Sequence, residues 1–359
     1  MKKSIVIILS LFTFGFGVND NVGTSVANFL KIQAGGRAAA MAGAFCAQVN
    51  DGSALYLNPS GLSHITKTQV FFNRTNWLLD LEHSFAGLVI PVGRLGNMGI
   101  SINYLNYGEM EETTEFEPHG TGRKFSASDL ALGVSFSKWI SDRFTFGATV
   151  KYLQESISFS KAVGMAVDVG SQYRTNFSGL TIGMAITNFG TKMRMYGTDQ
   201  LIDVDAYPDD EGNTEVNGRL ETKGWPLPMS FRFGLSLQPI GEDALIKMNG
   251  IEGTVNLDYF DPRDINPIYA AGFELKVYDM LYFRTGMEWK FSKYDDTLDD
   301  SDSLANLEKE LGYDMKPAWG IGITSAAFPY LPYDIRFDYS VSDMGLLDLV
   351  KWYTFSISL

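Results

Sequence analysis

Apolar and polar residues alternate along most of the chain from about residue 67 onward, and clusters of Gly, Pro, Asn and Asp interrupt the alternation. The segments 128–137, 143–152 and 231–238 each place large apolar residues at every second position. A period of two puts successive side chains on opposite faces of a β-strand. The pattern therefore predicts an all-β fold made of many strands.

The two faces of these strands differ in a way that separates a soluble sheet from a membrane barrel. One face is large and apolar, and the other mixes Gly, Ser, Ala and Thr with isolated charged residues. Small and scattered charged side chains are typical of the lumen of a barrel whose apolar face contacts lipid. A sheet edge in lipid would leave backbone groups unpaired, so the sheet must close on itself.

Fourteen such segments occupy residues 67–359, an even number as expected for a bacterial outer-membrane barrel. The three longest connections, 108–126, 190–227 and 291–316, follow the third, seventh and eleventh strands. With both chain ends in the periplasm, all three fall on the outer side, and the turns at the other side are short. The pattern predicts a 14-stranded antiparallel transmembrane β-barrel. We expect aromatic girdles at the strand ends, formed by Tyr104, Tyr107, Tyr152, Tyr259, Tyr269, Trp289, Trp352 and Tyr353 at the outer side and by Trp139 and Phe144 at the inner side.

Two segments precede the first strand. Residues 1–17 combine Lys2 and Lys3, an apolar run and small residues, which is the order of a secretory signal peptide. Residues 18–66 are rich in Gly and Ala, and we interpret them as a plug in a lumen whose backbone diameter is on the order of 28 Å.

Within this segment, Asp51 or Ser53 is suited to cap a helical turn through 54–56, and 58–61 should end that turn. An alternative is that 58–61 is only a turn leading into the first strand. Arg37 is expected to pair with a lumen carboxylate, for which the candidates are Asp129, Glu274 and Asp338.

Composition and charge exclude several functions. The net charge of −13 argues against nucleic-acid binding. The single cysteine, Cys46, excludes an internal disulfide and a cysteine-based metal site, and the three histidines are widely separated. No Ser/His/Asp order or paired-His motif occurs, so we predict neither an enzyme nor a bound cofactor or metal. The three long connections hold 21 of the 42 acidic residues and 9 of the 29 basic ones. Solvated loops explain this charge better than a cation site, since 203–213 lacks the calcium-loop spacing.

The stretch KIQAGGRAAAMAGAFCAQVNDGSALYLNPSGL, residues 31–62, resembles the N-terminal signature of the PorV/PorQ family. It is also similar to the hatch of FadL-type long-chain fatty-acid transporters, in which an Asn-Pro-Ala motif recurs; Ser60 replaces the Ala here. The resemblance implies the bacterial cell outer membrane, with its lipid as a partner. The residues that carry the plug motif are Gly35, Arg37, Gly43, Asp51, Asn58, Pro59 and Gly61.

Two functions remain open from the resemblance. A PorV-like barrel would take part in type IX secretion and engage exported proteins, with secretion components and cargo as partners. A FadL-like barrel would transport long-chain fatty acids or other hydrophobic small molecules. The sequence of residues 35–45 is nearer to the PorV/PorQ signature and favours the secretion function. Candidate partner contacts on loops are Trp77, Leu78, Phe116 and Trp225, and candidate lumen-facing ligand contacts are Arg143, Lys151, Arg232, Lys276, Arg284 and Arg336.

Overall fold

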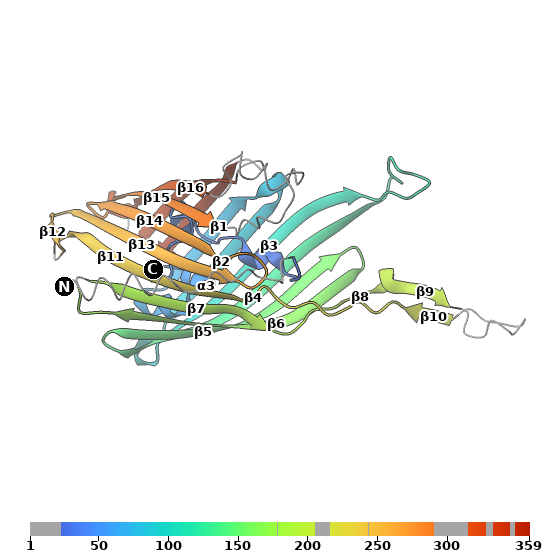
Figure 1. Cartoon of the computed structure of the whole chain (residues 1–359), viewed down its shortest axis with the longest axis horizontal. Helices are drawn as coiled ribbons and strands as arrows, with labels where there is room; N and C mark the ends of the chain where they lie inside the picture. Colours follow the sequence, from blue (N-terminus) through green and yellow to red (C-terminus); the bar gives the residue numbers. More distant parts are fainter. Residues whose placement is uncertain are drawn as a thin grey trace, which may run out of the picture.

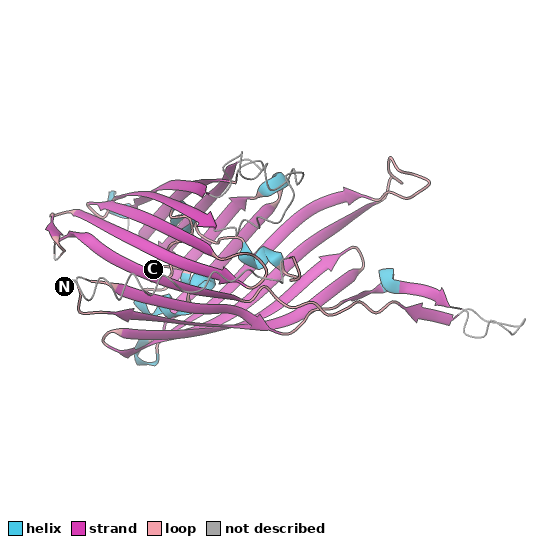
Figure 2. Cartoon of the chain, in the orientation of Figure 1, coloured by secondary structure: helices cyan, strands magenta, loops and turns pink. Residues whose placement is uncertain are grey.

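The computed structural model of the protein describes residues 23–177, 179–204, 216–242, 244–290, 315–327, 333–344 and 349–359. Strands make up most of the described chain, and the helices are short (Figures 1 and 2). In these residues no helix has the length and apolar character needed to cross a membrane. The predicted signal peptide, residues 1–17, lies outside the described residues.

Fourteen antiparallel strands form a closed barrel, as predicted. Each strand is hydrogen-bonded to its neighbours, and the cylinder closes through the pairing of β1 with β18 and of β7 with β11. The barrel strands are β1 (Gln69–Asn76), β2 (Glu82–Pro91), β3 (Asn97–Glu111), β4 (Lys124–Ser141), β5 (Phe144–Ile157), β6 (Ser160–Arg174), β7 (Thr181–Gly190), β11 (Ser230–Gly241), β13 (Ile251–Pro262), β14 (Ile268–Val277), β15 (Leu281–Lys290), β16 (Met315–Thr324), β17 (Asp334–Asp343) and β18 (Leu349–Ser358).

The two ends of the barrel differ in the length of their connections. The long connections follow β3, β7 and β15, and they all leave the same end. In barrels of this class the long connections face the cell exterior and the short turns face the periplasm. After β7 the chain forms β8 (Met195–Gly197), which pairs with β6, and then β9 (Leu201–Val204) and β10 (Val216–Arg219). Strands β9 and β10 pair only with each other among the described strands and project beyond the barrel (Figure 1).

The remaining short elements lie in turns. They are η3 (Leu78–Asp80), η4 (Gly93–Leu95), η5 (Thr198–Gln200), η6 (Ser325–Ala327) and β12 (Ile246–Lys247), of which β12 pairs in parallel with β11.

Alternation along each strand separates a lipid-facing surface from an interior. Ile100 and Val134 on the outward rows are 56% and 57% exposed, whereas Ser135 and Ser340 on the inward rows are 1% and 0% exposed. The apolar rows therefore face outward, as the sequence predicts.

Three of the expected girdle residues point inward instead. The hydroxyl of Tyr107 donates to the buried carboxylate of Asp129 at 2.7 Å, and the other two are tryptophans that contact the N-terminal segment. The indole of Trp352 is buried and donates to the carbonyl of Gln33 at 2.9 Å, and that of Trp139 donates to the carbonyl of Ser63 at 2.9 Å. Both indole N–H groups have acceptors in the N-terminal segment, so the two tryptophans contact that segment rather than the membrane interface.

The N-terminal segment, residues 23–66, contains η1 (Asn28–Lys31), α2 (Gly36–Ala40), α3 (Ala54–Leu57) and η2 (Pro59–His64). The helix α2 contacts β15–β18, and η2 contacts β3–β6, on another part of the wall. Its apolar side chains form a core with the first strands, and this core includes Met41, Phe45, Leu55, Leu62, Phe71, Phe85 and Val89. The small residues of this segment therefore allow its backbone to approach inward-facing groups of the barrel.

Candidate functional site

A buried ion pair joins α2 to the barrel wall. The Nε and Nη2 atoms of Arg37 donate to the two carboxylate oxygens of Glu274 on β14, at 2.8 and 2.7 Å. Its Nη1 atom lies 3.1 Å from a carboxylate oxygen of Asp51. This bidentate geometry is the strong form of an arginine–carboxylate interaction. Of the three carboxylates expected as partners, Glu274 is the one that Arg37 contacts.

Arg284 and Arg336 extend this pair into a cluster of three arginines and three carboxylates. Arg284 donates to Glu274 at 2.6 Å and to Asp338 at 2.8 Å, and Arg336 donates to Asp338 at 2.9 Å. The formal charges of the cluster cancel, which lowers the cost of burying it. Burial alone would lower the pKa of Arg37, but Glu274 and Asp51 outweigh burial and raise it. Burial alone would raise the pKa of Asp51, but Arg37, Arg336 and the hydrogen bond from Ser53 lower it.

The glycines of the motif bring backbone atoms close to the wall. Gly35 precedes α2 as its N-cap residue, with a φ of 112° that an L side chain rarely adopts. The next residue, Gly36, donates its backbone N–H to Thr354 at 2.7 Å. Gly43 has a φ of 81°, and its carbonyl accepts a hydrogen bond from Arg232 at 2.9 Å. The guanidinium of Arg232 also lies 4.2 Å from the centre of the Phe260 ring.

Asn58 links three parts of the structure. Its Oδ1 accepts from the backbone N–H of Ser60 at 3.2 Å and so caps η2, in the manner of a helix N-cap. Its Nδ2 donates to the carbonyl of Cys46 at 3.1 Å. A Cβ at Gly170 of β6 would overlap Asn58, and one at Gly147 of β5 would overlap the backbone of Pro59. The stretch 58–61 therefore packs against the wall in addition to leading toward β1.

The predicted helical turn is present as α3, but its cap differs from the expectation. Ser53 occupies the N-cap position without a side-chain capping bond, and the carboxylate of Asp51 accepts the backbone N–H of Ser53 at 3.0 Å. Gly61 lies where a Cβ would meet the carbonyl of Val49 at 2.5 Å.

Two wall residues that hold the segment were not singled out from the sequence. Asp258 accepts the backbone N–H groups of Phe45 and Cys46 at 3.2 and 3.0 Å. Gln172 donates from Nε2 to the carbonyls of residues 46, 47 and 49. Their only sequence signal is a polar residue on an inward row. Burial raises the pKa of the Cys46 thiol, which keeps it protonated and unreactive.

The predicted lumen-facing cations divide into paired and unpaired groups. Lys151 lies 2.6 Å from Asp168, and Lys276 lies 2.8 Å from Glu252 and 2.7 Å from Asp279. Arg143 has no carboxylate within ion-pair distance among the described residues. Structural pairing therefore accounts for these predicted cations except Arg143.

The predicted loop contacts also divide. Trp77 and Leu78 pack on buried clusters at the outer end of the barrel. Phe116 is 91% exposed beyond β3, and Trp225 is 40% exposed, with its backbone paired to Met193. The first two stabilise the barrel rim, and the last two are available at the surface.

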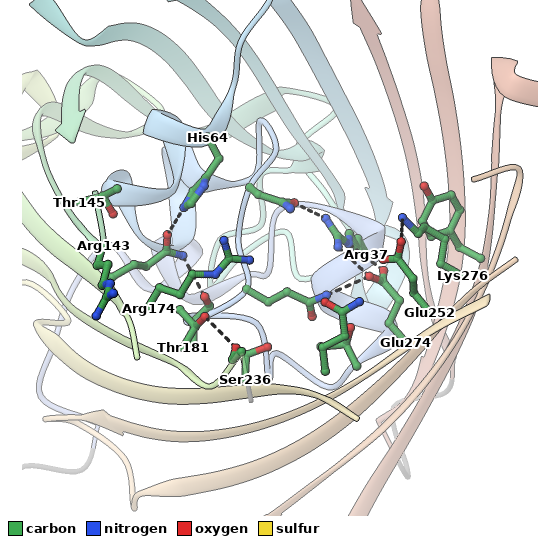
Figure 3. Close-up of a pocket in the computed structure, with 18 of the residues that line it drawn as sticks. Arg37, His64, Arg143, Thr145, Arg174, Thr181, Ser236, Glu252, Glu274 and Lys276 are labelled. Atoms are coloured by element: carbon green, nitrogen blue, oxygen red, sulfur yellow. Dashed lines mark hydrogen bonds and ion pairs between the residues drawn. The ribbon is translucent and has the colours of Figure 1, made fainter. Parts of the chain in front are cut away.

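Two cavities lie on opposite sides of the N-terminal segment. The outer cavity, about 480 Å³, is lined largely by apolar groups such as Phe29, Trp77 and Leu105. The periplasmic cavity, about 390 Å³, is lined by polar and charged groups, including Arg143, Arg174 and Lys276 (Figure 3). In the described part of the chain, no group of three or more His, Cys, Asp or Glu side chains is placed to hold a metal ion.

The sequence of this chain matches a known family. The model of the family described as "Type IX secretion system protein PorV" matches residues 17–204, which is more than half of the chain. The chain therefore belongs to the PorV family, a family of outer-membrane barrel proteins, and the protein is located in the outer membrane. Comparison with curated protein sequences gives no significant match.

Solved structures share the fold. The CymD monoaromatic hydrocarbon channel aligns with a TM-score of 0.53 and 11% identity over 90% of this chain and 96% of that chain. The toluene transporter TodX of Pseudomonas putida gives 0.53 and 13%, over 89% and 96%. A FadL homologue of Pseudomonas aeruginosa gives 0.50 and 15%, over 90% and 97%. At these identities the likeness concerns the fold, which is that of outer-membrane channels and transporters rather than of enzymes.

Proposed function

We propose that the protein is a component of type IX secretion that engages exported polypeptides at the outer end of its barrel. The observation that carries this proposal is the family match, which spans the N-terminal segment, the first seven barrel strands and β8–β9. The match thus includes one side of the β9–β10 projection as well as the membrane part.

The outer end presents apolar side chains that the barrel itself does not use. Phe116 is 91% exposed between β3 and β4, and Ile202 and Val216 on the β9–β10 pair are 39% and 45% exposed. Exposed apolar side chains on a polar, acidic surface are suited to contact another polypeptide. The free edges of β9 and β10 add backbone donors and acceptors that an extended segment can pair with.

The N-terminal segment supports a role at the surface rather than a conducting one. We interpret residues 23–66 as a plug, because they are held by the buried Arg37–Glu274 pair and by bonds to Asp258, Gln172 and Thr354. Under this interpretation, the plug closes the lumen to a polypeptide. Exported proteins are then engaged outside the lumen.

Site-directed photo-crosslinking tests the proposal. A photoreactive residue at Phe116 or Ile202 in cells that export type IX cargo should capture secretion components or cargo. The matched control is Val134, which is also exposed but lies on the lipid-facing row of β4. Crosslinks from Phe116 and Ile202 that contain only lipid, like those from Val134, would contradict the proposal.

The outer cavity favours a second function, transport of a hydrophobic small molecule. Its lining combines apolar side chains such as Ile32 and Trp352 with the cations Lys31 and Lys316. An apolar pocket with few polar groups is the usual form of a site for such a ligand. A stoichiometric fatty acid in the purified protein, lost in Leu105→Glu, would support this alternative, and lipid extracts without such a ligand would exclude it.

A further inference from the structure

The periplasmic cavity carries more positive charge than its structural pairs require. Its lining includes five basic residues and two acidic ones, although the whole chain has a net charge of −13. Both acidic residues already form ion pairs: Glu274 contacts Arg37 and Arg284, and Glu252 contacts Lys276. The excess positive charge at this end is therefore local and lies in the cavity.

The excess comes from Arg143 and Arg174. Neither has a carboxylate within 4.0 Å among the described residues, and their side chains line the same cavity (Figure 3). Their backbones are directly opposite, because the N–H of Arg174 donates to the carbonyl of Arg143 at 2.9 Å. Like charges that face each other across a strand pair destabilise the sheet. Both side chains are exposed at the mouth of the barrel, and they lack the carboxylate partner that the buried Arg37 and Arg284 have.

A second, independent feature lies beside them. The hydroxyl of Thr145, two residues after Arg143 on the same inward row, lines the cavity but has no hydrogen-bond partner. Thr145 is only 1% exposed. A buried hydroxyl without a partner costs free energy, and polar groups of this kind are usually satisfied in the working state of a protein. The site thus combines the guanidinium groups of Arg143 and Arg174 with the hydroxyl of Thr145, which has no hydrogen-bond partner.

We propose that Arg143, Arg174 and Thr145 form a binding site for an oxyanion at the periplasmic mouth of the barrel. The ligand is a carboxylate or phosphate group of a small periplasmic molecule that fits a cavity of about 390 Å³. Guanidinium groups bind such oxyanions with paired, charge-assisted hydrogen bonds, and the hydroxyl of Thr145 donates one more. The bound anion supplies the missing counter-charge. This proposal does not depend on the function of the outer end.

Isothermal titration calorimetry on the full mature chain in neutral detergent tests the site, with citrate and inorganic phosphate as probes at low salt. We expect saturable binding of at least one probe. The substitutions Arg143→Gln and Arg174→Gln should each weaken it by about tenfold or more, and Thr145→Val by less. The matched control is Arg94→Gln, which removes an arginine from the turn between β2 and β3 at the same end, away from the cavity.

The pattern of results decides both the ligand and the proposal. Binding of both probes indicates a general oxyanion site, citrate alone indicates a carboxylate ligand, and phosphate alone a phosphorylated one. Heat-modifiable migration on gels establishes that each variant is folded. No saturable binding of either probe, or an equal loss in Arg94→Gln and in folded Arg143→Gln, would overturn the proposal.

Discussion

At the scale of residues, each buried arginine or lysine side chain in the described part of the chain pairs with a carboxylate. A charge removed from water costs several kcal/mol unless an opposite charge and hydrogen bonds replace its hydration. Arg37, Arg284 and Arg336 meet this condition through three carboxylates, and Lys151 meets it through Asp168. The cluster around Arg37 differs from the Lys151–Asp168 pair because it joins the N-terminal segment to the barrel wall.

Removal of one member of this cluster should destabilise the protein more than removal of a pair. Arg37→Gln leaves a buried excess of negative charge, so we expect it to lower the free energy of unfolding by about 3–5 kcal/mol. The double variant Arg37→Gln/Glu274→Gln keeps the cluster neutral and should recover part of that loss. Urea-induced unfolding from phospholipid vesicles measures both.

The control for this measurement is an ion pair on the surface. Lys67 and Asp334 lie 2.6 Å apart, but their side chains are 56% and 68% exposed. Solvent screens such a pair, so Lys67→Gln should change stability by less than about 1 kcal/mol. Equal decreases in the free energy of unfolding for Lys67→Gln and Arg37→Gln would show that the buried cluster stabilises the protein no more than a surface ion pair does.

The sequence narrowed the partner of Arg37 to three carboxylates but did not select among them. Alternation assigns a residue to the inner or outer face of a strand, and this is how Glu274 became a candidate. It gives no information about where α2 lies around the circumference of the barrel. The contacts of Asp258 and Gln172 with backbone groups at 45–49 could not be predicted for the same reason. They depend on where the N-terminal segment lies against the wall, which alternation does not specify.

At the scale of elements, the sequence predicted the strands well where lipid imposes a pattern and less well beyond the membrane. The fourteen barrel strands and the three long connections match the prediction. The sequence pattern places the extensions of β3 and β4 and the pair β9–β10 in loops. A ribbon exposed to solvent on both faces has no buried row, so its sequence lacks strict alternation. Leu201, Ile202 and Val204, for example, are all exposed.

The β9–β10 projection should be dispensable for folding and required for export. Among the described residues, its two strands make no ladder with the barrel strands, so replacement of 201–219 by a short Gly-Ser linker removes none of the described barrel pairings. We expect unchanged heat-modifiable migration and an unfolding midpoint close to that of the parent. The amount of type IX cargo at the cell surface should fall severalfold, as measured by immunoblotting of surface and periplasmic fractions. Normal cargo export by this variant would assign engagement to another part of the outer end.

At the scale of the whole molecule, the N-terminal segment and the barrel wall together line two cavities of different chemistry. The outer one is mainly apolar, and the periplasmic one is polar with a local excess of positive charge. The segment contacts both β3–β6 and β15–β18, so its removal from the lumen would break bonds on both parts of the wall. A secretion component that works at its outer surface has no need of that movement, whereas a transporter that moves its substrate through the lumen does.

A disulfide between the segment and the wall distinguishes these two modes. The backbone N–H of Gly36 lies 2.7 Å from the Thr354 hydroxyl, and a Cβ at Gly36 would lie 3.2 Å from that oxygen. Gly36→Cys/Thr354→Cys in a Cys46→Ser background should therefore form a bond that holds α2 against β18. We expect cargo export by the oxidised variant to remain within about twofold of that of its reduced form. The reduced form of the same variant is the matched control, because it carries identical substitutions. Export that stops on oxidation and returns on reduction would mean that the segment must move, and it would refute engagement at the outer surface alone.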